Sequence, residues 1–62
     1  MKIRVYTCDT YLDIDIKDIT QELLLQNLED GNTVVLTKTD GNIFILNMIN
    51  VIAIEVIPPI NN

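Results

Sequence analysis

Residues 33–57 read TVVLTKTDGNIFILNMINVIAIEVI and hold most of the apolar side chains of the chain in β-favouring form. At the centre of this stretch, Asp40-Gly41 stands between two runs of alternating β-branched and aromatic residues. Asp-Gly in this setting is typical of a two-residue hairpin loop, because glycine tolerates the positive φ of a type I′ turn. We therefore predict two antiparallel strands in which Thr39 lies opposite Asn42.

This register fixes which side chains share a face of the sheet, because side chains alternate along a strand. One face would carry Val34, Leu36, Ile43 and Ile45. The other would carry Val35, Phe44, Leu46 and Met48. Both faces are apolar, and strands of this kind are normally covered on both sides. A third strand over residues 51–57 repeats the pattern and would complete a meander, so one short chain can hardly cover both faces itself.

The first part of the chain alternates charged and apolar residues over residues 2–6 and again over residues 11–16. The alternation predicts an N-terminal hairpin with Ile3, Val5, Leu12, Ile14 and Ile16 turned inward. On its solvent face, Lys2 and Arg4 would lie near Asp13 and Asp15, a cross-strand match of opposite charges.

Leucines at helical spacing predict a helix of about three turns between the two groups of strands. Its apolar stripe is Ile19, Leu23, Leu24 and Leu28, and Leu25 lies off the stripe. Asp18 is the expected N-cap, with Gln21 completing a pattern similar to a capping box. Gly31 is expected to end the helix in the left-handed conformation.

The predicted fold is a single α+β domain over residues 1–62 with the order β-β-α-β-β-β, an antiparallel sheet and one helix packed on one face. Pro58-Pro59 ends the last strand, and residues 58–62 are expected to form a loose tail. An alternative arrangement has the helix over the face of Phe44. We expect the helix to cover the face of Leu36. The candidate interface is then the opposite face, Val35, Phe44, Leu46 and Met48, together with Glu55, the one charged residue of the last strand.

Composition restricts the function classes. The formal net charge is −5, and the scattered Lys and Arg residues disfavour direct binding of nucleic acid. One cysteine and no histidine leave no intrachain disulfide and no zinc-type ligand set. No signal-peptide pattern and no membrane-spanning apolar run is present, so we expect a cytoplasmic protein.

Catalysis is not expected, because the chain has no His, no Ser and no phosphate-binding loop from which a nucleophile and base could be assembled. Asp9, Asp13 and Asp15 are closely spaced, as carboxylates are in calcium sites. Alternation places two of them on a solvated strand face, and no loop completes a site. We therefore expect no metal and no cofactor.

Part of the C-terminal half resembles a known family. Residues 34–47, followed by Ile52-Ala53-Ile54-Glu55 and Pro58, are similar to the small flagellar FlbD-type proteins, in which a Leu-Thr strand, a glycine turn, a Phe-Leu-Asn strand and an Ile-Glu strand recur. The resemblance covers under half of the chain and implies the strands alone. Residues 1–31 have no counterpart in that family, so no flagellar role follows from it.

The two-sided apolar sheet predicts a homo-oligomer, because a chain near the lower size limit of a stable domain gains by burying surface against a copy. The function that we expect is a non-catalytic protein-binding module, a regulator or inhibitor encoded by a bacterium or a mobile element, whose partner has a basic surface. One alternative is an oligomer that sequesters a small molecule or nucleotide between subunits. A second alternative is a structural assembly subunit.

Overall fold

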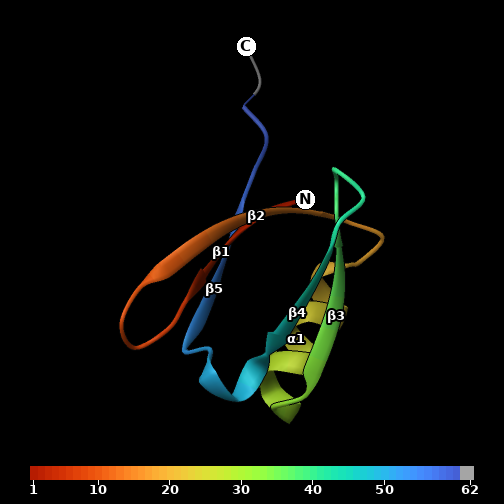
Figure 1. Cartoon of the computed structure of the whole chain (residues 1–62). Helices are drawn as coiled ribbons and strands as arrows, with labels where there is room; N and C mark the ends of the chain where they lie inside the picture. Colours follow the sequence, from red (N-terminus) through yellow and green to blue (C-terminus); the bar gives the residue numbers. More distant parts are fainter. Residues whose placement is uncertain (61–62) are drawn as a thin grey trace.

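The computed structural model describes residues 1–60, which form a curled five-stranded antiparallel sheet with one α-helix (Figure 1). In chain order the elements are β1 (Lys2–Tyr6), β2 (Tyr11–Lys17), α1 (Gln21–Asp30), β3 (Thr33–Lys38), β4 (Ile43–Asn47), the 3₁₀ helix η1 (Met48–Asn50) and β5 (Ala53–Ile57). The strands lie side by side in the order β4-β3-β2-β1-β5. The predicted α+β class and element order are confirmed, and the structure adds η1. Asn61 and Asn62 of the predicted tail lie outside the described residues.

The N-terminal hairpin is confirmed with the expected pairing. β1 and β2 are antiparallel, with Ile3 opposite Ile14 and Val5 opposite Leu12. Ile3 and Val5 are fully buried, and Ile14 is buried beside them. Regular alternation of charged and apolar residues leaves a single face that can point inward, which is why the sequence predicts this hairpin correctly.

The β3–β4 hairpin closes with a loop of three residues, one more than predicted. The N–H of Lys38 donates to the carbonyl oxygen of Asn42 at 2.8 Å, and the N–H of Gly41 donates to the carbonyl oxygen of Lys38 at 2.9 Å. These bonds leave residues 39–41 in the loop, with Gly41 at φ +90°. A glycine with positive φ at the last loop position is typical of a three-residue hairpin loop rather than of the two-residue turn.

The extra loop residue shifts the register by one and moves side chains to the other face. Leu36 lies opposite Phe44, where Ile45 was predicted. The inner face of β3 and β4 carries Val34, Leu36, Phe44 and Leu46, all buried or partly buried. The outer face carries Val35, Ile43 and Ile45. The predicted division of β4 between the two faces is therefore wrong.

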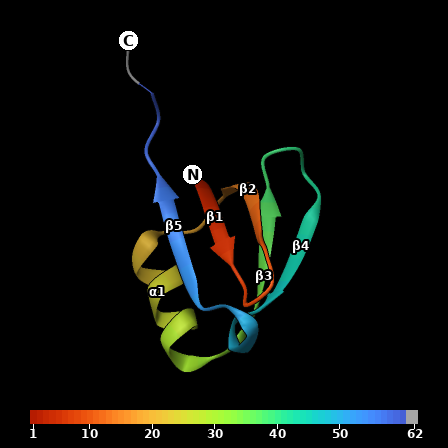
Figure 2. The same ribbon diagram turned by 90° about the vertical axis from the view of Figure 1, so that its left-hand side faces the viewer.

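The last strand, β5, pairs with β1 and not with β4, so the predicted meander is also wrong. The N–H of Met48 in η1 donates to the carbonyl oxygen of Asn32 at 3.0 Å. The N–H of Ile52 donates to the carbonyl oxygen of Tyr6 at 2.9 Å. η1 therefore carries the chain from the end of β4 across to β1. Figure 2 shows β5 beside β1, with η1 at the lower end of both strands.

Helix α1 begins later than predicted, and its N-cap is Thr20 rather than Asp18. The Thr20 hydroxyl oxygen accepts a hydrogen bond from the N–H of Leu23 at 3.2 Å. Asp18 instead takes a left-handed conformation, φ +64°, in the connection from β2. At the other end Gly31 takes φ +67° and caps the helix as predicted.

The apolar stripe of α1 is narrower than predicted. Leu24 is buried in the same core as the inner face of the sheet, and Leu28 is partly buried against that core. Ile19 also packs there, but it lies before the helix and not on its stripe. Leu23 is 47% exposed, although the spacing placed it on the stripe. Leu25 is exposed, as expected. α1 lies beside β5 in Figure 2, and through Leu24 the helix packs on the inner face of the sheet.

The corrected N-cap gives a pair of opposite expectations for stability. Thr20→Ala removes the capping acceptor and should lower the free energy of unfolding by about 1 kcal/mol. Asp18→Gly should raise it by up to about 1 kcal/mol, because glycine adopts the left-handed conformation without a Cβ clash. Urea denaturation followed by circular dichroism measures both changes. A loss of stability in Asp18→Gly together with no loss in Thr20→Ala would restore Asp18 as the cap.

Candidate interaction surface

The outer face of the sheet is divided into an aliphatic half and a polar half. On β3 and β4, three aliphatic side chains are largely in solvent: Val35 is 62% exposed, Ile43 68% and Ile45 65%. Val35 and Ile45 lie directly opposite each other across the two strands. We call Val35, Ile43 and Ile45 the aliphatic patch. The largest contiguous apolar patch on the surface of a soluble protein is often a site of interaction.

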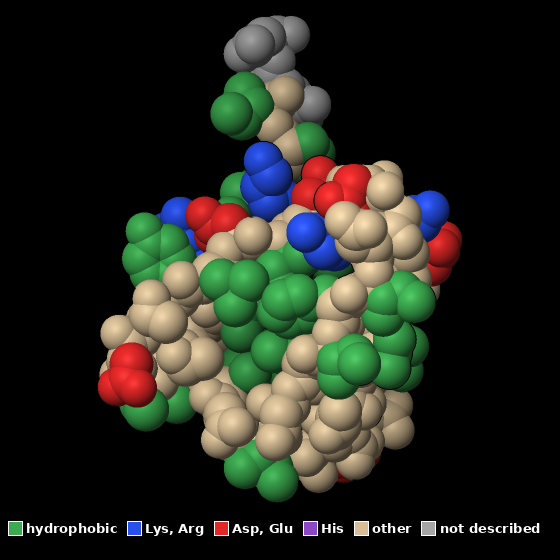
Figure 3. Space-filling view, viewed as in Figure 1, with side chains coloured by type: hydrophobic (Ala, Val, Ile, Leu, Met, Phe, Trp, Pro, Cys, Tyr) green, Lys and Arg blue, Asp and Glu red, His purple; other side chains and the backbone are tan. Residues whose placement is uncertain are grey.

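A second apolar surface lies between the two hairpins. Figure 3 shows hydrophobic side chains gathered in a hollow between the β1–β2 hairpin and β4, and a further group over β3 and β4 at the right of the view. The partly buried side chains of the inner face include Leu12, Val34 and Phe44. β2 pairs with β3 through only two residue pairs, Ile16 with Lys38 and Lys17 with Thr37. The hairpins diverge beyond these pairs, which leaves the hollow.

The five predicted interface residues do not share one surface. Leu46 is 8% exposed and Met48 is 1% exposed, so both belong to the core. Phe44 is partly buried against that core. Val35 and Glu55 are exposed on the outer face. The expectation that Phe44, Leu46 and Met48 lie on an outward face is therefore corrected, and the structure exposes Ile43 and Ile45 in their place.

Sequence reasoning missed Ile43 and Ile45 because of the loop length alone. Every residue from Ile43 to Leu46 is apolar, so neither register buries a polar side chain and hydrophobicity does not choose between them. The sequence feature that could have indicated the longer loop is the polar tetrapeptide Thr39-Asp40-Gly41-Asn42. In the structure an Asp40 carboxylate oxygen accepts from the N–H of Asn42 at 2.9 Å.

The polar half of the outer face is a cluster centred on Arg4. Its guanidinium group donates two hydrogen bonds to the Asp13 carboxylate, at 2.7 and 3.1 Å. It also lies over the ring of Tyr11, 4.4 Å from the centroid. The Tyr6 hydroxyl donates to the Glu55 carboxylate at 3.1 Å. The cross-strand charge match predicted for Arg4 and Asp13 is confirmed, and Glu55 lies beside this cluster rather than beside the aliphatic patch.

Hydrogen bonds lower the pKa of two carboxyl groups. The pKa of Asp13 lies below its usual value because Arg4 donates to the carboxylate. The pKa of Asp40 lies below its usual value because the backbone N–H of Asn42 donates to it. A pKa that is lower in the folded chain than in the unfolded chain stabilises the fold above the unfolded value, and this contribution is lost as pH falls through the folded value.

We therefore expect the melting temperature to fall on acidification below about pH 4, partly through Asp13. Asp13→Asn should reduce the slope of melting temperature against pH in that range. Arg4→Gln should have the same effect, and the double variant should add little to either single change. Thermal denaturation at a series of pH values measures the slopes. An unchanged slope in Asp13→Asn would show that the Arg4–Asp13 pair contributes nothing to acid sensitivity.

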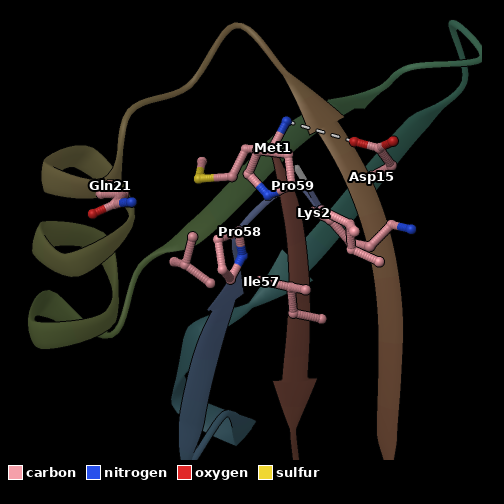
Figure 4. Close-up of a pocket in the computed structure, with 9 residues that line it drawn as sticks. Met1, Lys2, Asp15, Gln21, Ile57, Pro58 and Pro59 are labelled. Carbon is pink, nitrogen blue, oxygen red and sulfur yellow. Dashed lines mark ion pairs between the residues drawn. The ribbon is translucent and has the colours of Figure 1, made fainter. Parts of the chain in front are cut away.

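One open pocket lies at the end of β1 and β5, where the chain leaves the sheet (Figure 4). Its volume is about 1020 Å³, and its lining includes Lys2, Gln21, Pro58 and Pro59. The N-terminal ammonium group lies 3.5 Å from the Asp15 carboxylate. Among the described residues of the lining, Asp15 is the one carboxylate.

The remaining candidate chemistry is not brought together. Within residues 1–60, no three His, Cys, Asp or Glu side chains are grouped so that they could hold a metal ion. Cys8 is exposed in the turn between β1 and β2. In the same described range, no helix combines the length and the apolar character that a membrane crossing requires.

Comparison of the chain with protein-family models, curated proteins and solved structures finds no match.

Proposed function

We propose that this chain is a non-catalytic, acidic protein-binding module that acts as a homo-oligomer and regulates or inhibits a protein partner in the cytoplasm. The observation that carries the proposal is the aliphatic patch. Three β-branched side chains, each about two-thirds exposed, lie on one face of one hairpin. A chain of 62 residues is near the size at which one core alone is marginal, so covering this patch also stabilises the fold.

The distribution of charge supports a partner with a basic surface. Asp18, Glu22, Glu29 and Asp30 lie in and around α1, and residues 18–30 contain no Lys or Arg. This segment therefore carries four of the nine acidic residues and a charge of −4. A negatively charged segment speeds association with a basic partner and disfavours acidic ones.

A second candidate is the binding of a small molecule, for which one chain offers a site without a second subunit. The observation that favours it is the pocket of about 1020 Å³ at the end of β1 and β5, which is at the upper limit of the size range of ligand sites. Its lining has three neighbouring apolar residues from the end of the chain, Pro58, Pro59 and Ile60.

Two measurements separate the candidates. Affinity capture with the purified chain is compared with capture by a variant carrying Glu22→Lys and Glu29→Lys, which reverses two exposed charges of α1. A partner that is retained by the native chain and lost with the charge-reversed chain supports protein binding. A thermal-shift screen of nucleotides and metabolites tests the second candidate. A ligand that raises the melting temperature with no protein partner present would contradict the first proposal and favour sequestration.

A further inference from the structure

We propose that two copies of this chain associate by antiparallel pairing of the free edges of β4, which joins the two sheets into one. This inference rests on the proposed homo-oligomer and specifies how its subunits meet. β4 is the last strand at one side of the sheet. Its only strand neighbour within residues 1–60 is β3.

The hydrogen-bonding phase of β4 identifies the backbone groups that are free. In an antiparallel ladder, directly opposite residues alternate between hydrogen-bonded and non-hydrogen-bonded pairs. Bonds from Lys38 N–H to Asn42 and from Met48 N–H to Asn32 stand at the two ends of the β3–β4 ladder. Counting in steps of two from either end, Phe44 and Leu46 bond to β3. Ile43, Ile45 and Asn47 therefore direct their N–H and C=O groups away from β3.

The free backbone groups and the exposed side chains belong to the same residues. Ile43 and Ile45 have outward backbone groups, and both side chains are in the aliphatic patch. A two-fold axis at Ile45 places Ile45 opposite Ile45, and Ile43 opposite Asn47, in the second copy. Each of these residues has its N–H and C=O directed to the partner strand. The strand is thus complementary to itself in backbone phase, and the central pair joins two apolar side chains, Ile45 with Ile45.

The two edges of the sheet differ in protection against such pairing. Natural edge strands avoid self-association through charged residues, prolines or bulges. β5, at the other edge, has Glu55 at its centre and Pro58-Pro59 directly after it. β4 reads Ile-Phe-Ile-Leu-Asn and has neither a charge nor a proline. The unprotected edge is therefore β4.

The charges of the chain also leave this edge accessible to a second copy. Each copy carries a net charge of −5, which opposes association at most surfaces. Residues 33–37 and 42–54 carry no charge. At the loop between them, Lys38 and Asp40 form an ion pair at 3.6 Å. Two copies that meet at β4 bring no unpaired carboxylate of this hairpin into the contact.

The exposed area argues for pairing of edges over stacking of outer faces. The three side chains of the aliphatic patch expose on the order of 300 Å² per copy, whereas a standard stable interface buries about 800 Å² per partner. Stacking of the patches alone is therefore too small. Edge pairing adds main-chain hydrogen bonds, and it places the partner strand beside the hollow of Figure 3, where inner-face apolar side chains are open to solvent.

Amide exchange of the native chain tests the inference without any substitution. The N–H groups of Ile43 and Ile45 should be unprotected at low concentration and protected at high concentration, because the partner strand bonds them. Those of Phe44 and Leu46 should be protected at both. If the N–H groups of Ile43 and Ile45 exchanged as fast in the dimer as in the monomer, edge pairing would be overturned. The proposed homo-oligomer would still stand.

A proline substitution gives an independent test. Ile45→Pro removes one outward N–H and leaves the ladder with β3 intact, so it should weaken dimerisation by at least about 100-fold while the circular dichroism spectrum is kept. The control is Thr37→Glu, which places a charge on the outer face opposite Ile43 and near Lys17. It should change the dissociation constant by less than about threefold.

The opposite result, with dissociation by Thr37→Glu and none by Ile45→Pro, would assign the contact to the outer faces and overturn edge pairing alone. A native chain that stays monomeric at all concentrations would overturn both the inference and the homo-oligomer on which it rests.

Discussion

Replacing Met48 with aspartate is expected to unfold the chain, whereas the same replacement at the neighbouring Ile49 leaves it folded. Met48 is 1% exposed and Ile49 is 75% exposed. A carboxylate at position 48 would be buried among apolar side chains with no partner, which costs more than the roughly 5 kcal/mol by which a small domain is stable. Met48→Ala should still fold, with a loss of about 2–4 kcal/mol.

Far-UV circular dichroism and urea denaturation measure this difference. The comparison also decides between the predicted and the observed place of Met48. If Met48 lay on an outward interface, as its predicted face required, Met48→Asp would give a folded chain that no longer associates. A folded Met48→Asp variant with a melting temperature close to that of the native chain would show that Met48 does not lie in the core.

The N-terminal hairpin could be predicted because its polar and apolar residues alternate. Lys2, Arg4, Asp13 and Asp15 can face only solvent, and this fixes the faces of the two strands. The structure then pairs Arg4 with Asp13. The end of the helix was equally clear, because Gly31 follows the last turn and takes the left-handed conformation.

The β3–β4 hairpin could be located but not assigned to faces. Its strands are apolar on both sides, so a shift of one residue has no hydrophobic cost, and the loop length decides the register. The partner of β5 was missed for a different reason. A short connection usually joins neighbouring strands, but η1 uses it to cross from β4 to β1. The N-cap was misplaced because Asp18 and Thr20 are both good capping residues and the chain turns at Asp18 first.

The second large effect is expected at Ile45. Ile45→Asp should give a folded chain whose copies associate more weakly, with a dissociation constant raised by about tenfold, because two like charges would lie directly opposite each other on the paired strands. Leu36→Asp, on the inner face of the same hairpin, should unfold the chain, since Leu36 is 2% exposed. Ile49→Asp serves as the matched control, because Ile49 is exposed but lies outside the aliphatic patch, and this variant should keep its association.

Sedimentation equilibrium of the native chain at micromolar concentration tests most directly whether copies of this chain associate. We predict a mass of at least twice the 7.0 kDa of one chain, falling toward that of one chain on dilution. A mass of 7.0 kDa at every concentration, in a chain that binds no dye specific for exposed apolar surface, would contradict this account.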